Sequence, residues 1–193
     1  MFEVIEIRLE RLSAEAFAPF GQLICARSDE PPIFEAPQHL RSWRQDFEVL
    51  GPTELMYIHY LHRPMAFSNL ERHFQVTQTF IALGGAASVM VVAPPTGSES
   101  VPEPDALRAF FVPGTVGLML WRGTWHALTR FPATPGGAGF AFLTDAITQR
   151  ELEKQRADGT PPRLTQEIDY RERYGVSFKV VDPDGLLAAG ASA

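Results

Sequence analysis

Cysteine and an excess of basic charge are what this sequence most clearly lacks. Cys25 is the single cysteine among 193 residues, which excludes an intramolecular disulfide and a cysteine-rich zinc site and favours a reducing compartment. The chain carries 17 Lys and Arg residues against 23 Asp and Glu, for a formal charge of −6. Because such a chain has no basic field to attract polyphosphate, we expect a small-metabolite partner and no nucleic acid.

Long apolar runs are absent as well. No stretch of 18 apolar residues occurs, and residues 1–8 mix charged with apolar side chains, without the basic and apolar regions of a leader peptide. We therefore expect a cytoplasmic protein with no membrane partner. With 45% hydrophobic residues the chain can bury a full core, and one domain is the expected organisation.

Short strand patterns separated by turns dominate the chain. Apolar runs, several of them alternating or rich in aromatic and β-branched residues, predict strands at residues 4–9, 22–26, 43–48, 55–62, 78–83, 87–93, 110–112, 116–120 and 139–144. The proline-rich segment 28–37 is expected to be a loop. Many short strands without alternating long helices are typical of an all-β sandwich or barrel.

Short helices are predicted in between and towards the C-terminus. Ser13 is expected to cap one short helix, and Pro104 to begin a single helical turn. After the last predicted core strand, residues 148–151 have the form of a capping box and predict a helix that continues to Arg156. The remaining predictions are a second helix at 165–174, an edge strand at 176–181 and a fraying tail from Leu186.

Polar residues with ligating side chains occur at two places in the strand pattern. In an extended segment Glu71 and His73 share one face, whereas Arg72 lies on the other. Further along the chain, Arg122 and His126 share a face by the same period-two rule. Carboxylate and imidazole groups act as acid–base catalysts or as ligands of borderline divalent ions.

The spacing of these residues resembles the two motifs of the cupin superfamily. The first has the form E-x-H-x4-Q-x6-G and contains Glu71, His73 and Gln78; the second, G-x2-H, ends at His126. Four strings are similar to the ureidoglycolate lyase (ureidoglycolate hydrolase) family: ERH at 71–73, QTFIALGG at 78–85, PDALRAF at 104–110 and RGTWH at 122–126. The resemblance covers most of the chain up to Leu143, after which the sequence departs from the family pattern.

The resemblance implies a fold and an activity. The implied fold is a cupin-like double-stranded β-helix, or jelly roll, in a single domain 1–193, with its core at 4–144 and appended helices and an edge strand at 145–185. The implied enzyme is a carbon–nitrogen (amidine) lyase that cleaves (S)-ureidoglycolate to glyoxylate and urea in allantoin and purine catabolism. A homodimer is also implied, and the open sheet of a jelly roll leaves edge strands that a partner commonly covers. The alternative is a non-catalytic or metal-dependent cupin that binds another small hydroxy or keto acid.

Two roles stay open for the ligating residues. In a cupin-like barrel Glu71, His73, Gln78 and His126 would meet near the mouth, where they could hold a divalent ion such as Zn, Mn, Fe or Ni. Without a metal, His126 would be the general base, with Glu71 and His73 as its catalytic partners.

A substrate carboxylate needs a cationic partner, and arginine provides one through its planar two-donor fork. Shared-face parity favours Arg122 for this role over Arg72, which faces away from Glu71 and His73. Gln78, Phe80 and Trp125 complete the predicted substrate-binding set.

Overall fold

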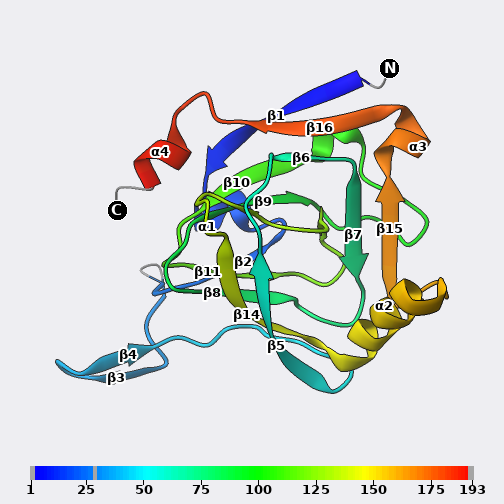
Figure 1. Cartoon of the computed structure of the whole chain (residues 1–193). Helices are drawn as coiled ribbons and strands as arrows, with labels where there is room; N and C mark the ends of the chain where they lie inside the picture. The colour runs from blue at the N-terminus through cyan, green and yellow to red at the C-terminus, as the bar shows by residue number, and fades with distance from the viewer. Residues whose placement is uncertain (1–2, 28–29, 191–193) are drawn as a thin grey trace.

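Two large β-sheets pack against each other in the computed structural model, which describes residues 3–27 and 30–190 (Figure 1). Within these residues nine strands form the larger sheet, in the order β15 (Thr165–Asp169), β7 (Asn69–His73), β12 (Trp125–Ala127), β9 (Ser88–Ala93), β10 (Arg108–Val112), β1 (Glu3–Arg11), β16 (Val176–Val181) and β6 (Ala66–Phe67), with β13 (Phe131–Pro132) paired to β9. The smaller sheet has the order β2 (Gly21–Ile24), β11 (Gly117–Leu120), β8 (Thr79–Leu83), β14 (Ala138–Asp145) and β5 (Thr53–Tyr60). The predicted all-β, cupin-like fold is confirmed.

An apolar cluster fills the space between the two sheets. Phe80 of β8 and Phe140 of β14 pack there with Met90 of β9. The neighbouring positions Val89 and Val91 point to the opposite face of β9 and join a second cluster, so all six residues of β9 are buried. A strand covered on both faces is a continuous apolar run. This explains the unbroken strand signal at residues 87–93.

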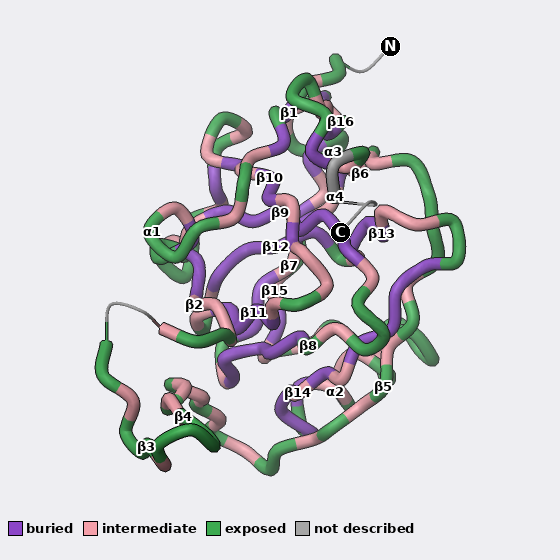
Figure 2. The backbone as a smooth tube through the Cα atoms, turned by 90° about the vertical axis from the view of Figure 1, so that its left-hand side faces the viewer, coloured by how far each residue is buried: buried purple, intermediate pink, exposed green. Residues whose placement is uncertain are grey.

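The larger sheet curls around the second cluster. Ile7 of β1 and Phe178 of β16 share that cluster with Val91 of β9 and Leu70 of β7, although these strands come from different parts of the sheet order. In Figure 2 the buried backbone lies in the middle of the molecule and the exposed segments surround it. The curl places β7 and β12 side by side in the larger sheet, with β5, β8 and β14 in the other.

Short helical segments join or flank the strands in the described part of the chain: α1 (Ala14–Phe17), η1 (Pro104–Ala106), α2 (Ala146–Asp158), α3 (Tyr170–Tyr174) and α4 (Leu186–Gly190). The predicted cap of α1 is confirmed, because the Ser13 hydroxyl oxygen accepts a hydrogen bond of 3.1 Å from the backbone N–H of Ala16. Among the described residues, none of the helices combines the length and apolar character that a membrane span requires.

The predicted capping box at residues 148–151 is wrong, because α2 begins earlier. Asp145 caps the helix instead: its Oδ2 atom accepts hydrogen bonds of 2.8 Å from both the backbone N–H and the hydroxyl of Thr148. Glu151 serves a different purpose, since its carboxylate accepts the backbone N–H groups of Arg163 and Leu164. These contacts tie α2 to the segment that leads into β15.

The predicted helix at 165–174 is wrong over its first half. Residues Thr165–Asp169 form β15, which pairs antiparallel with β7, and only Tyr170–Tyr174 are helical. Gly175 ends that helix in the left-handed conformation, with φ of 70°, as its glycine predicts. The strand at 176–181 exists, but it is not an edge strand, because β16 lies between β1 and β6.

Three further predictions need correction. Residues 43–48 form no strand, since their backbone makes no ladder with either sheet. The expected loop at 28–37 contains β3 (Phe34–Ala36), which forms a hairpin with β4 (Leu40–Ser42); residues 28–29 lie outside the described residues. The expected fraying tail begins with the helix Leu186–Gly190, and the Leu186 side chain is buried in the second cluster; residues 191–193 lie outside the described residues.

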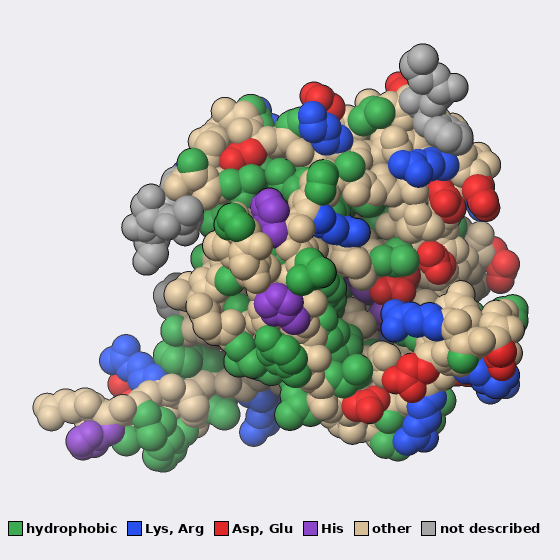
Figure 3. Space-filling view, viewed as in Figure 1, with side chains coloured by type: hydrophobic (Ala, Val, Ile, Leu, Met, Phe, Trp, Pro, Cys, Tyr) green, Lys and Arg blue, Asp and Glu red, His purple; other side chains and the backbone are tan. Residues whose placement is uncertain are grey.

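The outward face of the smaller sheet is apolar and open to solvent. Leu55 and Tyr57 of β5 and Leu83 of β8 are exposed there, and Phe34 and Leu40 are exposed on the β3–β4 hairpin. Figure 3 shows this hairpin projecting from the body, with hydrophobic side chains gathered on it and over the front of the molecule.

Candidate active site

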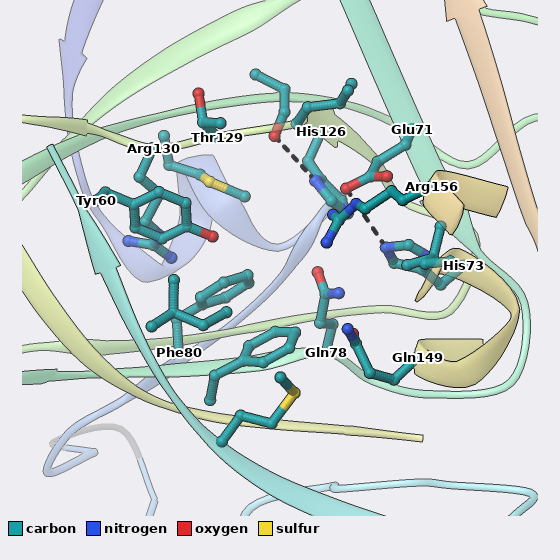
Figure 4. A pocket seen from close by; sticks show the side chains of 17 residues that line it. Tyr60, Glu71, His73, Gln78, Phe80, His126, Thr129, Arg130, Gln149 and Arg156 are labelled. Atoms are coloured by element: carbon teal, nitrogen blue, oxygen red, sulfur yellow. Dashed lines mark hydrogen bonds and ion pairs between the residues drawn. The ribbon is translucent and has the colours of Figure 1, made fainter. Parts of the chain in front are cut away.

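Three of the predicted ligating residues meet on two adjacent strands. Glu71 and His73 lie on β7, and His126 of β12 is paired directly with Glu71 in the antiparallel register. Ligand atoms of the three side chains all lie within 4.8 Å of one another. The Nε2 atom of His73 is 3.7 Å from Oε1 of Glu71, and the two imidazole centroids are 5.2 Å apart (Figure 4). Strand periodicity therefore assembles this cluster as predicted.

Each imidazole is fixed through its Nδ1 atom. Nδ1 of His73 is 2.9 Å from the hydroxyl oxygen of Thr165 on β15, and Nδ1 of His126 is 3.1 Å from the carbonyl oxygen of Ala127. A carbonyl oxygen only accepts, so Nδ1 of His126 donates and its Nε2 carries a lone pair in the neutral ring. Among the described residues both Nε2 atoms are buried without a hydrogen-bond partner. Histidines held in this way are typical metal ligands.

Burial decides the charge of this cluster. It lowers the pKa of His126 to about 4, against the opposing attraction of Glu71, so this imidazole is neutral at physiological pH. Burial also opposes ionisation of Glu71, but the imidazoles of His73 and His126 outweigh it and lower the pKa of the carboxyl. The cluster therefore combines an ionised carboxylate with at least one neutral imidazole lone pair.

The cluster lines a cavity of about 290 Å³ between the two sheets. Gln78 and Phe80, both predicted to contact substrate, line the same cavity, and Oε1 of Gln78 is buried without a hydrogen-bond partner among the described residues. The helix α2 contributes Gln149 and Arg156 to the lining (Figure 4). Polar and apolar side chains share this lining, so the cavity can enclose a small metabolite and also bind its polar groups.

Arg122 does not reach this cavity, so the parity argument that placed it beside His126 is wrong. The Arg122 side chain is exposed, and its Nε atom pairs with Oε2 of Glu48 at 3.2 Å. The extended period breaks because residues 122–123 form a turn, with Gly123 at φ of 80°. A substrate bound at the Glu71 cluster would not contact Arg122.

Arg72 and Trp125 also lie away from the cavity, on the opposite faces of their strands. Arg72 is buried, and its guanidinium donates to the backbone carbonyl oxygens of Thr96, Gly97 and Ser98 and to the side chain of Gln166. It also lies over the Trp125 ring, 4.6 Å from the centroid. Both residues stabilise the loop after β9, and the prediction that they bind substrate is wrong for the cavity at Glu71.

Sequence reasoning missed several polar residues of the cavity, among them Tyr60, Arg130 and, on α2, Gln149 and Arg156. Arg130 follows β12 after a bend at residues 128–129, so no regular period connects it to His126. Its side chain is 2% exposed and lines the cavity beside Tyr60. The one sequence signal was an arginine placed directly before the apolar strand β13.

The jelly-roll fold and the Glu71 cluster define a cupin-like protein with a metabolite-sized cavity, and comparisons with known proteins identify the family. The sequence model described as "Ureidoglycolate lyase" matches residues 4–159. The chain therefore belongs to the ureidoglycolate lyase family, as its motifs predicted, and this family membership indicates that it is a lyase.

Similar proteins carry the same name. The chain is 34% identical over 124 residues to a ureidoglycolate lyase of Pseudomonas syringae pv. syringae (strain B728a), a match that covers 61% of this chain and 71% of the relative. It is 35% identical over 126 residues to one of Pseudomonas aeruginosa (strain LESB58), covering 62% and 73%. A ureidoglycolate lyase of Burkholderia cepacia is 32% identical over 126 residues, covering 62% and 70%.

Proposed function

We propose that this protein cleaves the carbon–nitrogen bond of ureidoglycolate and releases glyoxylate and urea, a step of allantoin and purine catabolism. The observation that carries the proposal is the Glu71–His73–His126 cluster, which combines a carboxylate and two imidazoles at the wall of a metabolite-sized cavity. The names of the related proteins support the same substrate. The expected cytoplasmic location fits a reaction on a soluble metabolite.

The cluster fits a divalent metal ion. His73 and His126 each present a buried Nε2 atom without a hydrogen-bond partner in the described chain, and Glu71 adds an ionised oxygen ligand. Because His126 is neutral, no proton competes for its lone pair at physiological pH. Nitrogen and oxygen ligands of this kind suit Zn, Mn, Fe or Ni. When bound, such an ion would supply Lewis-acid stabilisation of negative charge that develops on a substrate oxygen.

The side chains around the cluster match the groups that react. The hydroxyl proton of the substrate passes to the Glu71 carboxylate while the oxygen–carbon bond becomes the carbonyl of glyoxylate. The electrons of the breaking carbon–nitrogen bond remain on nitrogen, which takes up that same proton from Glu71 and departs as urea, so that the carboxylate is regenerated. Gln78 can accept a hydrogen bond from an N–H of the departing ureido group, because its Oε1 atom has no partner among the described residues.

His126 contributes through its lone pair rather than as a strong base. An imidazole whose pKa is about 4 accepts a full proton poorly at neutral pH, but it can hold the substrate hydroxyl or a metal ion. The pKa of the Glu71 carboxyl is lowered as well, so neither group is a strong base. In this proposal Glu71 accepts the hydroxyl proton only transiently, before that proton passes to the departing nitrogen.

A direct test is to incubate the purified protein with (S)-ureidoglycolate and measure glyoxylate and urea together. The proposal expects equal amounts of the two products, and it expects Glu71→Gln to lose this release. Release of ammonia without urea would contradict the lyase reaction, and tight binding without product would support the non-catalytic alternative. Repeating the assay after chelator treatment, and then after adding back each divalent ion, tests the metal.

A further inference from the structure

Within the described part of the chain, Arg130 is a buried cation that pairs with no carboxylate. Its side chain is 2% exposed, and its Nε and Nη2 atoms have no hydrogen-bond partner among the described residues. To the residues that the structure describes, its guanidinium donates one hydrogen bond, a long one of 3.3 Å from Nη1 to the hydroxyl oxygen of Ser88. Buried arginines normally donate to several acceptors or pair with a carboxylate. Arg130 therefore differs from Arg72, whose guanidinium is surrounded by carbonyl oxygens.

Aromatic rings hold the Arg130 guanidinium in place. Its central carbon lies 4.4 Å from the ring centroid of Phe80 and 4.9 Å from that of Phe140. Burial lowers the pKa of Arg130 to about 10, a value that still leaves the group charged at neutral pH. Two ring faces compensate a desolvated charge only in part. An anion that enters the cavity would complete the missing interactions.

We propose that Arg130 binds the carboxylate of the substrate, at the end of the cavity away from His73. The guanidinium and the Glu71 cluster line one cavity of about 290 Å³, and in Figure 4 Arg130 and Tyr60 lie on one side of it, with His73 on the other. In an α-hydroxy acid the carboxylate and the hydroxyl are on neighbouring carbons, so the cavity holds both groups of one small molecule. The ligand class is therefore a small α-hydroxy or α-keto carboxylate.

The other arginine of the cavity is less suited to this role. Arg156 reaches the cavity from α2, but it is exposed to solvent. Water screens an exposed charge and weakens its attraction for a carboxylate, whereas a desolvated guanidinium interacts strongly. We therefore assign the anchoring contact to Arg130 and treat Arg156 as the matched comparison.

The identity of the substrate in this assignment rests on the proposed function. The preference of Arg130 for an anion does not, because it follows from the guanidinium itself, whose Nε and Nη2 atoms have no partner among the described residues. The test accordingly uses glycolate and its uncharged amide, glycolamide, which differ only at the carboxylate. Titration calorimetry on the parent protein should show clearly tighter binding of glycolate. Arg130→Met should weaken glycolate binding by at least about 30-fold, the lower limit for losing a buried charged partner, and leave glycolamide within about twofold. Arg130→Lys keeps the charge but loses the fork, so its loss should be intermediate.

Thermal unfolding of the unliganded proteins separates binding from structure. Because Arg130 makes few compensating contacts, Arg130→Met should melt at or above the temperature of the parent. Arg156→Gln should lose less glycolate affinity than Arg130→Met.

Three results would overturn the assignment: a parent that does not distinguish glycolate from glycolamide, an Arg130→Met variant with full glycolate affinity, or a larger loss in Arg156→Gln. A fall in melting temperature with equal loss of both ligands would show a structural role instead. If the parent releases no urea and yet Arg130→Met loses glycolate alone, the lyase proposal fails while the carboxylate site stands. If the parent releases urea and Arg130→Met binds glycolate as the parent does, the lyase proposal stands and the assignment of the carboxylate to Arg130 fails.

Discussion

Replacing Arg72 by methionine should destabilise the protein without weakening substrate binding. The Arg72 guanidinium donates to the carbonyl oxygens of Thr96 at 2.7 Å, of Gly97 at 3.0 Å and of Ser98 at 3.0 Å, and its Nε donates to Gln166 at 2.9 Å. Removing a buried, hydrogen-bonded charge and leaving its acceptors unpaired costs about 3–5 kcal/mol of the free energy of unfolding. For a chain of this size, that loss corresponds to a fall in melting temperature of roughly 6–20 °C.

Thermal and urea denaturation followed by circular dichroism would measure this loss. Arg122→Met is the matched control, because Arg122 makes an exposed pair with Glu48 and such pairs contribute about 0–1 kcal/mol. Calorimetry with glycolate should find both variants binding as the parent does. If Arg72→Met kept its full stability and lost glycolate affinity, our reasoning about the outer face of β7 would be refuted.

Three other predictions concern the cluster and the assembly. His126→Asn should lower turnover of ureidoglycolate and release any bound metal, measured by elemental analysis, because the lone pair that holds the hydroxyl or the metal is lost, with little change in melting temperature; a folded and fully active variant would contradict this. Because the pKa of His126 is about 4 in the folded chain and near 6.5 when unfolded, the unfolded chain binds the extra proton between these values. The free energy of unfolding should therefore fall by up to about 3 kcal/mol from pH 7 to pH 4. Urea denaturation at a series of pH values should find a smaller fall in His126→Asn than in the parent. We also propose a homodimer in which the exposed apolar face of the smaller sheet is covered; light scattering at micromolar concentration should return twice the chain mass of 21.4 kDa, and a monomer mass would remove the idea.

Period-two alternation predicted correctly that Glu71 and His73 share a face, because their strand is regular, whereas the place of His126 beside them was implied by the resemblance to cupins. β7 is hydrogen-bonded to a neighbour on each side, so Glu71 and His73 keep the same face over the whole strand. The same rule failed for Arg122, where a glycine with positive φ turns the chain before β12 begins. A rule based on alternation holds only as far as the backbone stays extended.

Long-range contacts decided what the sequence could not predict. Residues 165–169 have a local pattern that suits a helix, but β7 offers unpaired backbone groups, and pairing with them makes a strand. The local signal of Arg130, an arginine directly before an apolar strand, did not indicate function, because its surroundings come from other strands, Phe80 of β8 and Phe140 of β14. The lack of acceptors for its Nε and Nη2 atoms among the described residues is a property of the folded surroundings alone.

The pairing of β15 with β7 also sets the smallest unit that can fold as a functional enzyme. The family match ends at residue 159, yet Thr165, beyond that limit, fixes the His73 ring through a hydrogen bond of 2.9 Å. A polypeptide shortened to the family boundary would keep Glu71, His73 and His126 and lose the strand that orients them. It would also expose the backbone groups of β7 to other copies of itself, a route to aggregation. The part of the chain that positions the candidate site is therefore longer than the part that matches the family model, because it includes β15.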